Sequence, residues 1–143
     1  MQPPLAFTCG DPSGVGPEII AAWIARHPMQ ANGVVPIGPS RWIESLGLGG
    51  ISVGPENFCS TPGVPSVEGA RVAFEALEEA ARGCREGRFS AVVTGPVSKE
   101  WMAKAGFPYP GQTEFFAARW GGILQWPLPA GALPWHWPLG IFR

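Results

Sequence analysis

Two glycine-containing segments hold residues that could bind a small anion. The segment "GDPSGVGPE" (10–18) joins an apolar run to a helix start, where unpaired amide groups and the helix dipole attract negative charge. It includes Asp11 and matches neither the GxGxxG fingerprint nor a P-loop, because no GK[ST] follows. The segment "VTGPVSK" (93–99) ends a second apolar run and supplies Lys99. Asp11 and Lys99 are therefore candidates for an anion pocket. The alternatives are a tight strand-to-helix turn and a solvated surface lysine.

A third segment, "YPGQTEF" (109–115), places polar side chains at the start of a helix. Gln112 and Thr113 could contact a ligand there. The alternative is a simple turn followed by Thr113 as the helix N-cap. Together, in this order and at these separations, the three segments are more specific than any one of them.

Strands and helices alternate along the chain and would position these residues. Short apolar runs predict strands near 5–9, 33–37 and 90–94. This alternation predicts an α/β fold with a largely parallel sheet and helices on its faces. Ligands collect beyond the carboxyl ends of such strands, so Asp11, Lys99 and Thr113 are expected toward one edge of the sheet. Helices are expected from Pro17 to a stop at Pro28, and over 40–47, 66–86, 98–106 and 113–122.

The strongest helical pattern follows Ser66, which is expected to cap it. Phe74, Leu77, Ala81 and Cys84 recur on one apolar stripe of this helix. Residues 48–65 hold many turn formers and are expected to be mostly loop.

Composition narrows the class of protein. The net charge is −1 and 15% of the residues are charged, with no basic stripe of the kind that binds nucleic acid. The sequence has three cysteines, Cys9, Cys59 and Cys84, which are widely spaced and form no CxxC motif. Buried thiols in a reducing compartment are favoured over a disulfide or a metal site. The first residues lack the pattern of a signal peptide, and we expect a cytoplasmic protein.

With "PGVPSVEGARVAFEALEEA" (62–80), the three segments resemble the 4-hydroxythreonine-4-phosphate dehydrogenase family of pyridoxal phosphate biosynthesis. The resemblance covers residues 5–122. It implies the N-terminal portion of a three-layer α/β/α fold like that of isocitrate and isopropylmalate dehydrogenases. Relatives that oxidise other four-carbon phosphorylated hydroxy acids share the motifs, so the substrate is less firmly implied than the family.

The resemblance also implies cofactors and partners. Family members are homodimers that use NAD and a divalent metal (Zn, Mg or Co) to oxidise and decarboxylate a small phosphorylated substrate. Three histidines hold the metal, and a His-Thr pair in "GHTEF" contacts substrate. Here that motif is "GQTEF", so Thr113 matches and Gln112 replaces the histidine. Glutamine can hydrogen-bond a substrate oxygen but cannot titrate near pH 7.

Residues 123–143 differ from the rest, with three tryptophans, four prolines and no charge before Arg143. Prolines and glycines would break a membrane-spanning helix here, so no membrane segment is expected. A back-translation with one base inserted after Gly122 gives strands similar to the family's continuation. We therefore interpret residues 1–122 as the α/β portion and 123–143 as an out-of-frame tail. The alternative is a Trp/Pro tail that docks in a groove.

Under this interpretation His136 is accidental and is not a metal ligand. The chain would then lack the family's metal site and most of its NAD site, and would be inactive despite its enzymatic ancestry. The competing hypothesis is a non-catalytic fragment that retains anion binding or dimerisation.

Overall fold

The computed structural model describes residues 2–121 and divides the chain into two compact units, Met1–Pro108 and Tyr109–Arg143. The first unit is a parallel sheet with helices on both faces. The predicted tail lies outside the described residues, and the division expected after residue 122 stays a prediction. Among the described residues, no helix is both long enough and apolar enough to cross a membrane. The elements of the first unit are β1 (Leu5–Thr8), α1 (Gly16–Arg26), α2 (Pro28–Ala31), β2 (Val34–Gly38), α3 (Ser40–Leu46), β3 (Ile51–Ser52), α4 (Val67–Arg85), β4 (Ala91–Thr94) and α5 (Lys99–Lys104).

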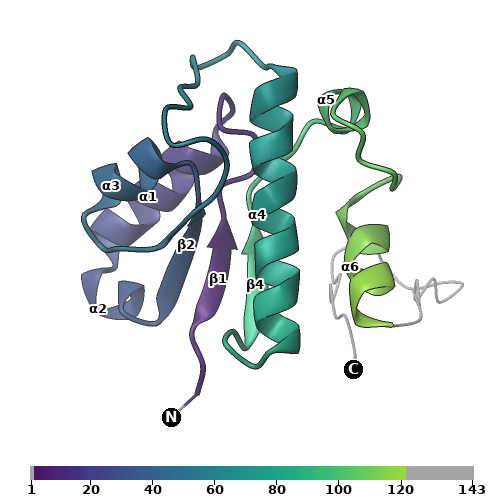
Figure 1. Cartoon of the computed structure of the whole chain (residues 1–143). Helices are drawn as coiled ribbons and strands as arrows, with labels where there is room; N and C mark the ends of the chain where they lie inside the picture. The colour runs from purple at the N-terminus through teal and green to yellow at the C-terminus, as the bar shows by residue number, and fades with distance from the viewer. Residues whose placement is uncertain (1, 122–143) are drawn as a thin grey trace, which may run out of the picture. The chain divides into compact units, whose positions relative to one another are not determined.

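The strand order is β3-β2-β1-β4, and every pairing is parallel. After β1 the chain adds strands toward β3, and α4 then carries it back across the sheet to place β4 on the other side of β1 (Figure 1). The order therefore reverses between β1 and β4, the position where open α/β sheets bind their ligands. The predicted α/β class is confirmed.

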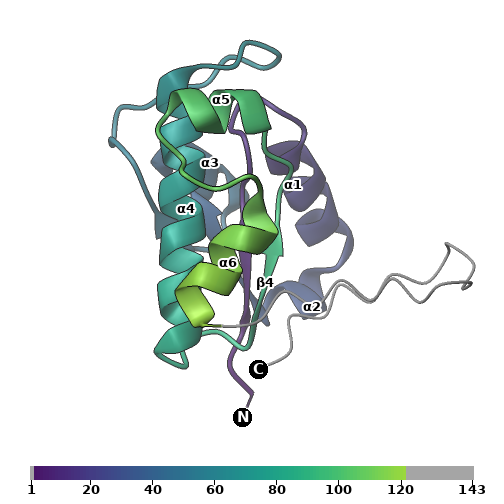
Figure 2. The ribbon, with the colours of Figure 1, turned by 90° about the vertical axis from the view of Figure 1, so that its right-hand side faces the viewer.

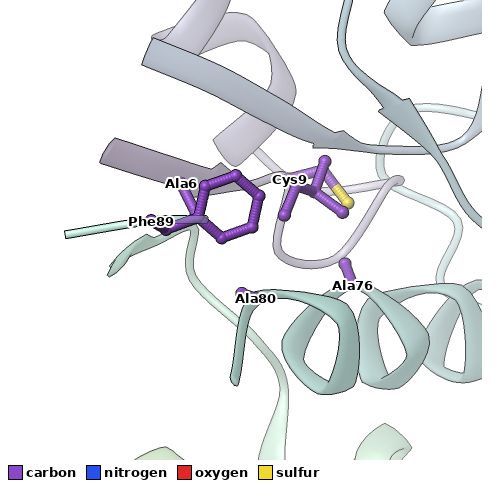
Figure 3. Packing of buried hydrophobic residues seen from close by; sticks show 6 residues of the cluster. Ala6, Cys9, Ala76, Ala80 and Phe89 are labelled. Atoms are coloured by element: carbon purple, nitrogen blue, oxygen red, sulfur yellow. The ribbon is translucent and has the colours of Figure 1, made fainter. Parts of the chain in front are cut away.

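Helix α4 covers one face of the sheet (Figure 2). Ser66 Oγ accepts a hydrogen bond from Gly69 N at 2.9 Å, which confirms the predicted cap. Small residues on the inner side of the helix allow it to approach the strands closely. Figure 3 shows Ala76 and Ala80 of α4 facing Ala6, Cys9 and Phe89, all buried in one cluster.

Helix α1 covers the opposite face (Figure 2). Phe7 of β1, Val34 of β2 and Ile20 of α1 form its buried cluster. Trp23 adds a tilted ring contact to Phe7, with centroids 5.3 Å apart. Odd-numbered positions of β1 thus face α1, while Ala6 faces α4, as the alternation of a strand buried on both faces requires.

The second unit is described over Tyr109–Gly121 and contains helix α6 (Gln112–Trp120). Its aromatic rings touch in sequence, from Tyr109 to Phe115, then Phe116, then Trp120, with centroids 4.7–5.6 Å apart. Arg119 stacks over Tyr109 and Phe115 and donates a hydrogen bond to the Tyr109 hydroxyl at 3.1 Å. These contacts connect the turn before α6 to the helix itself.

Two expectations about the elements hold with a short element added, and one is wrong. Pro28 does end α1, but it also begins α2, because proline is well tolerated in a first helical turn. The segment 48–65, expected to be mostly loop, is mostly loop, and it also contains the short strand β3, which exists through its pairing of Ile51 with Ile37. Thr113 is not the N-cap of α6, because the helix begins one residue earlier and Gly111 occupies that position.

Candidate functional site

The turns after β1 and β4 run side by side at the carboxyl edge of the sheet. Gly95 N donates to Thr8 O and Asp11 N donates to Pro96 O, both at 2.9 Å. The parallel pairing of the two strands therefore continues into the two turns. This edge is the point where the strand order reverses.

Glycines make this close approach possible. A Cβ at Gly10 would lie 2.6 Å from the carbonyl carbon of Gly95 and even closer to Pro96 O, and Gly10 has φ +70°. A Cβ at Gly16 would collide with Cys9 O. These two glycines thus accommodate the protein's own backbone. Gly14 is exposed and has no such close neighbour.

Asp11 holds the first turn together. Its Oδ1 accepts from Ser13 N at 2.9 Å and from Ser13 Oγ at 2.8 Å. This local bond pattern is an Asx-turn, which shapes the chain just before α1. The carboxylate has a structural role, and its negative charge does not itself attract an anion.

Lys99 is the first residue of α5 and is exposed. Ser98 caps this helix by accepting from Trp101 N at 3.4 Å. Asp11 lies in the turn after β1, and Lys99 begins the helix that follows the adjacent turn after β4, so both lie toward one edge of the sheet, as the sequence predicts. Whether their side chains share a ligand stays a prediction.

A third loop reaches the same edge. Gly63 N donates to Ser13 O at 2.8 Å, which connects the turn after β1 to the loop before α4. Pro12 lies against the first turn of α4, 3.8 Å from where a Cβ on Gly69 would stand. The positive N-terminal ends of α1 and α4 thus lie beside this turn. That of α4 is capped by Ser66, whereas no side chain caps α1 at Val15.

Cys9 and His27 do not face this edge as reactive groups, whereas Cys59 in the loop before α4 is exposed, contrary to the expectation of buried thiols. Burial raises the pKa of the Cys9 thiol to about 12, so it stays protonated and unreactive at neutral pH. His27 lies at the far end of α1, where its ring stacks on Trp23 and its Nδ1 lies 2.9 Å from Trp23 O. Among residues 2–121, no group of three His, Cys, Asp or Glu side chains could hold a metal ion.

Thr8 is a polar residue at this edge that the sequence analysis did not single out. It ends β1 in register with Thr94, its side chain is buried, and its Oγ1 has no hydrogen-bond partner. The signal available in the sequence was a threonine at the end of an apolar strand, directly before the glycine turn.

Gln112 and Thr113 begin α6 in the second unit. Gln112 Oε1 is buried without a hydrogen-bond partner, and no side chain caps the helix at Gly111. An unsatisfied buried acceptor at an uncapped helix start is costly unless a partner is supplied. Gln112 Oε1 is thus a polar atom at the start of α6 whose hydrogen-bonding capacity is unused.

The chain is similar to known proteins over most of its length. The family model described as pyridoxal phosphate biosynthetic protein PdxA matches residues 20–126. The 4-hydroxythreonine-4-phosphate dehydrogenase of Zymomonas mobilis is 41% identical over 138 residues, covering 82% of this chain and 41% of that protein. The chain thus spans less than half the length of this relative.

Solved structures agree on the fold. A crystal structure of 4-hydroxythreonine-4-phosphate dehydrogenase from Klebsiella pneumoniae superposes with a TM-score of 0.72 at 23% identity, covering 85% of this chain and 46% of that one. A terephthalate 1,2-cis-dihydrodiol dehydrogenase from Burkholderia xenovorans superposes with a TM-score of 0.66 at 25% identity, covering 85% and 41%. With the family model matching well over half of its residues, the chain belongs to the PdxA family of pyridoxal phosphate biosynthetic proteins.

Proposed function

We propose that this chain is the N-terminal portion of a cytoplasmic 4-hydroxythreonine-4-phosphate dehydrogenase. The observation that supports this most is the meeting of the β1 and β4 turns at the point where the strand order reverses. In the proposed reaction the secondary alcohol of the substrate is oxidised, and the resulting keto acid loses carbon dioxide. The described residues would shape one wall of the crevice in which this occurs.

NAD and a divalent metal are part of this proposal. The metal would act as a Lewis acid and the nicotinamide as the hydride acceptor. Residues 2–121 do not form a metal site, because no three of their His, Cys, Asp or Glu side chains lie close enough together to hold a metal ion. They do not fit a dinucleotide cradle either, since Gly10 and Gly16 accommodate backbone atoms of the protein itself. Both groups would need residues from outside the described region, and the proposed homodimer is one source of them.

Gln112 and Thr113 are the proposed substrate contacts. The Gln112 amide has an unpaired buried oxygen, which supports a polar ligand at the start of α6. A neutral amide can orient a substrate oxygen but cannot carry the charge of an imidazolium. We therefore expect Gln112→His to raise the turnover of any complete enzyme built from this chain.

A chimera tests the proposed function. Residues 5–121 of this chain would replace the matching part of the Z. mobilis relative, with and without Gln112→His. We expect NAD reduction with 4-phosphooxy-threonine and added zinc, magnesium or cobalt, higher in the His variant and lost in Thr113→Ala. A folded dimeric chimera that is inactive in both forms would contradict the proposal.

The 143-residue chain by itself should not turn over this substrate. Catalysis requires metal, nicotinamide and substrate phosphate to be held in one arrangement. The described residues present no metal site and two of the proposed substrate contacts. Turnover by the purified chain near that of the full-length relative would refute this expectation.

The second candidate is a non-catalytic fragment that binds anions. It is favoured by the uncapped N-terminus of α1, which adjoins the turns that hold Asp11 and Lys99. Titration with inorganic phosphate tests it, with Lys99→Gln expected to weaken binding and Lys104→Gln as the control on the same helix. Assaying the chimera with other four-carbon hydroxy-acid phosphates tests the remaining alternative, that the chain comes from a related dehydrogenase that oxidises one of them.

For residues 123–143 we propose an out-of-frame origin, in which the tail has no selected role and His136 is not a ligand. The match to the family model, which ends at residue 126, supports this proposal. Sequencing the DNA around the codon for Gly122 tests it. An intact frame confirmed by independent reads would favour an evolved Trp/Pro tail instead.

A further inference from the structure

Helix α6 starts without a side-chain cap. Its N-cap position is occupied by Gly111, which has no side chain to accept a hydrogen bond from the first turn. Helix α4, by contrast, is capped by the hydroxyl of Ser66. The first amides of a helix have no partner within the helix, and an uncapped end frays unless other contacts hold it. The start of α6 must therefore be held by contacts other than a cap.

Tyr109 makes a contact that can replace the cap. Its ring lies edge-on against Phe115, with centroids 5.6 Å apart and an interplanar angle of 79°. Phe115 is fully buried and is the fourth residue of α6. In a hydrophobic staple, a residue just before the N-cap packs on this fourth residue and fixes the angle at which the chain enters the helix. Here Pro110 is exposed, and Tyr109, one position earlier, makes the equivalent contact.

Arg119 adds a second attachment from the next turn of the helix. It follows Phe115 by four residues, so the two side chains lie on one face of α6. Its Cζ lies 5.1 Å from the Phe115 ring centroid and 5.8 Å from that of Tyr109. Its Nη1 also donates a hydrogen bond to the Tyr109 hydroxyl at 3.1 Å. A planar guanidinium can stack on rings and donate within its own plane, which the ammonium of a lysine cannot do.

The residues proposed to contact substrate lie between these attachments. Gln112 and Thr113 stand between Tyr109 and Phe115 in the chain, and the contact between the two rings fixes both ends of this short segment. We propose that Arg119 is a positioning residue, which holds the start of α6 through Tyr109 and so orients Gln112 and Thr113. The contact of these two residues with substrate rests on the proposed function, whereas the attachment of Tyr109 does not.

Amide hydrogen exchange in the complete 143-residue chain tests the attachment. The Phe115 amide donates to Gly111 O at 3.3 Å, so its exchange rate reports the opening of the first turn of α6. We expect Arg119→Met to accelerate this exchange about tenfold, the effect of losing one hydrogen bond from a charged donor. The Ala70 amide, which makes the corresponding bond to Ser66 O at the start of α4, should exchange at an unchanged rate.

Two further variants separate the Tyr109 attachment from a general loss of charge. Arg26→Met removes an exposed arginine from the last turn of α1 and should leave the Phe115 amide unchanged. Tyr109→Phe keeps the ring and removes the hydroxyl, so Arg119→Met should accelerate exchange less in this background than it does alone. The proposal is overturned if Arg119→Met leaves the Phe115 amide unchanged, or if the effects of the two substitutions on the opening free energy are additive.

The chimera with the Z. mobilis relative tests whether the attachment orients the substrate contacts. In an active chimera, Arg119→Met should raise the KM for 4-phosphooxy-threonine about tenfold and leave the KM for NAD unchanged, because it weakens only contacts made by the substrate. A merely structural role would lower the amount of active enzyme and leave both KM values unchanged, and that result would overturn the proposal. A chimera that is inactive without this substitution would contradict the proposed function, and exchange of the Phe115 amide would still decide whether Arg119 holds the start of α6.

Discussion

Replacing Gly10 by alanine should destabilise the first unit far more than an ordinary glycine substitution. Gly10 has φ +70°, where alanine costs roughly 1–2 kcal/mol. The new Cβ would also stand 2.6 Å from the carbonyl carbon of Gly95, so the turn after β4 must move. That movement breaks the Asp11 N to Pro96 O hydrogen bond, which contributes about 1 kcal/mol, and loosens the packing around it. We expect a total loss of about 3 kcal/mol.

Gly47 provides the matched control. It closes α3 with φ +65°, and a Cβ there would meet nothing within 4 Å. Gly47→Ala should therefore show only the conformational cost, about 1 kcal/mol. The difference in unfolding free energy between the two variants therefore measures the steric conflict between the β1 and β4 turns, separately from the cost of the left-handed backbone conformation.

Urea unfolding followed by circular dichroism measures both variants. With a slope of roughly 1–1.5 kcal/mol per molar urea, the extra 2 kcal/mol moves the midpoint of Gly10→Ala lower by about 1.5 M relative to Gly47→Ala. Equal midpoints would refute the reasoning, because they would mean that the two turns do not constrain each other.

Three further predictions concern the core and the helix cap. Ser66→Ala removes the acceptor for Gly69 N and should lower the free energy of unfolding by about 1 kcal/mol, measured against the exposed Ser60→Ala. Thr8→Val removes a buried hydroxyl without a partner and should raise the urea midpoint by an amount equivalent to about 1 kcal/mol; a lower midpoint would show that the hydroxyl is used. Burial raises the pKa of the Cys9 thiol from 9.0 to about 12, so the unfolded chain releases this proton first. Stability should therefore fall between pH 9 and pH 12, and less steeply in Cys9→Ala.

The strands and the long helix were predictable because their signals are local. Helix α4 has a capping serine, an acidic residue in its first turn and an apolar stripe, and all of these act within a few positions. Strands β1 and β4 are continuous apolar runs, as strands buried in a parallel sheet tend to be. The resulting alternation was enough to place Asp11 and Lys99 at one edge.

Two features were not predicted correctly, because local sequence signals do not decide them. β3 consists of Ile51 and Ser52, and only its register with Ile37 and Gly38 makes it a strand. The N-cap of α6 was misplaced because Gly111 and Thr113 are both acceptable caps on local grounds, and Gly111 is the residue with extended backbone. A residue's propensity does not decide between two such positions.

The glycine turn shows why the site was harder to infer than the fold. From the sequence, "GDPSGVG" could be an anion cradle or a tight turn, since glycine serves both. The structure assigns Gly10 and Gly16 to backbone packing, and the atom that requires Gly10 belongs to a turn far away in the sequence. These glycines would be required to fold the first unit even in a chain that binds no ligand. The motif is therefore strong support for the family and the fold, whereas activity must be argued from the groups that would touch substrate, for which Gln112 and Thr113 at the start of α6 are our proposal.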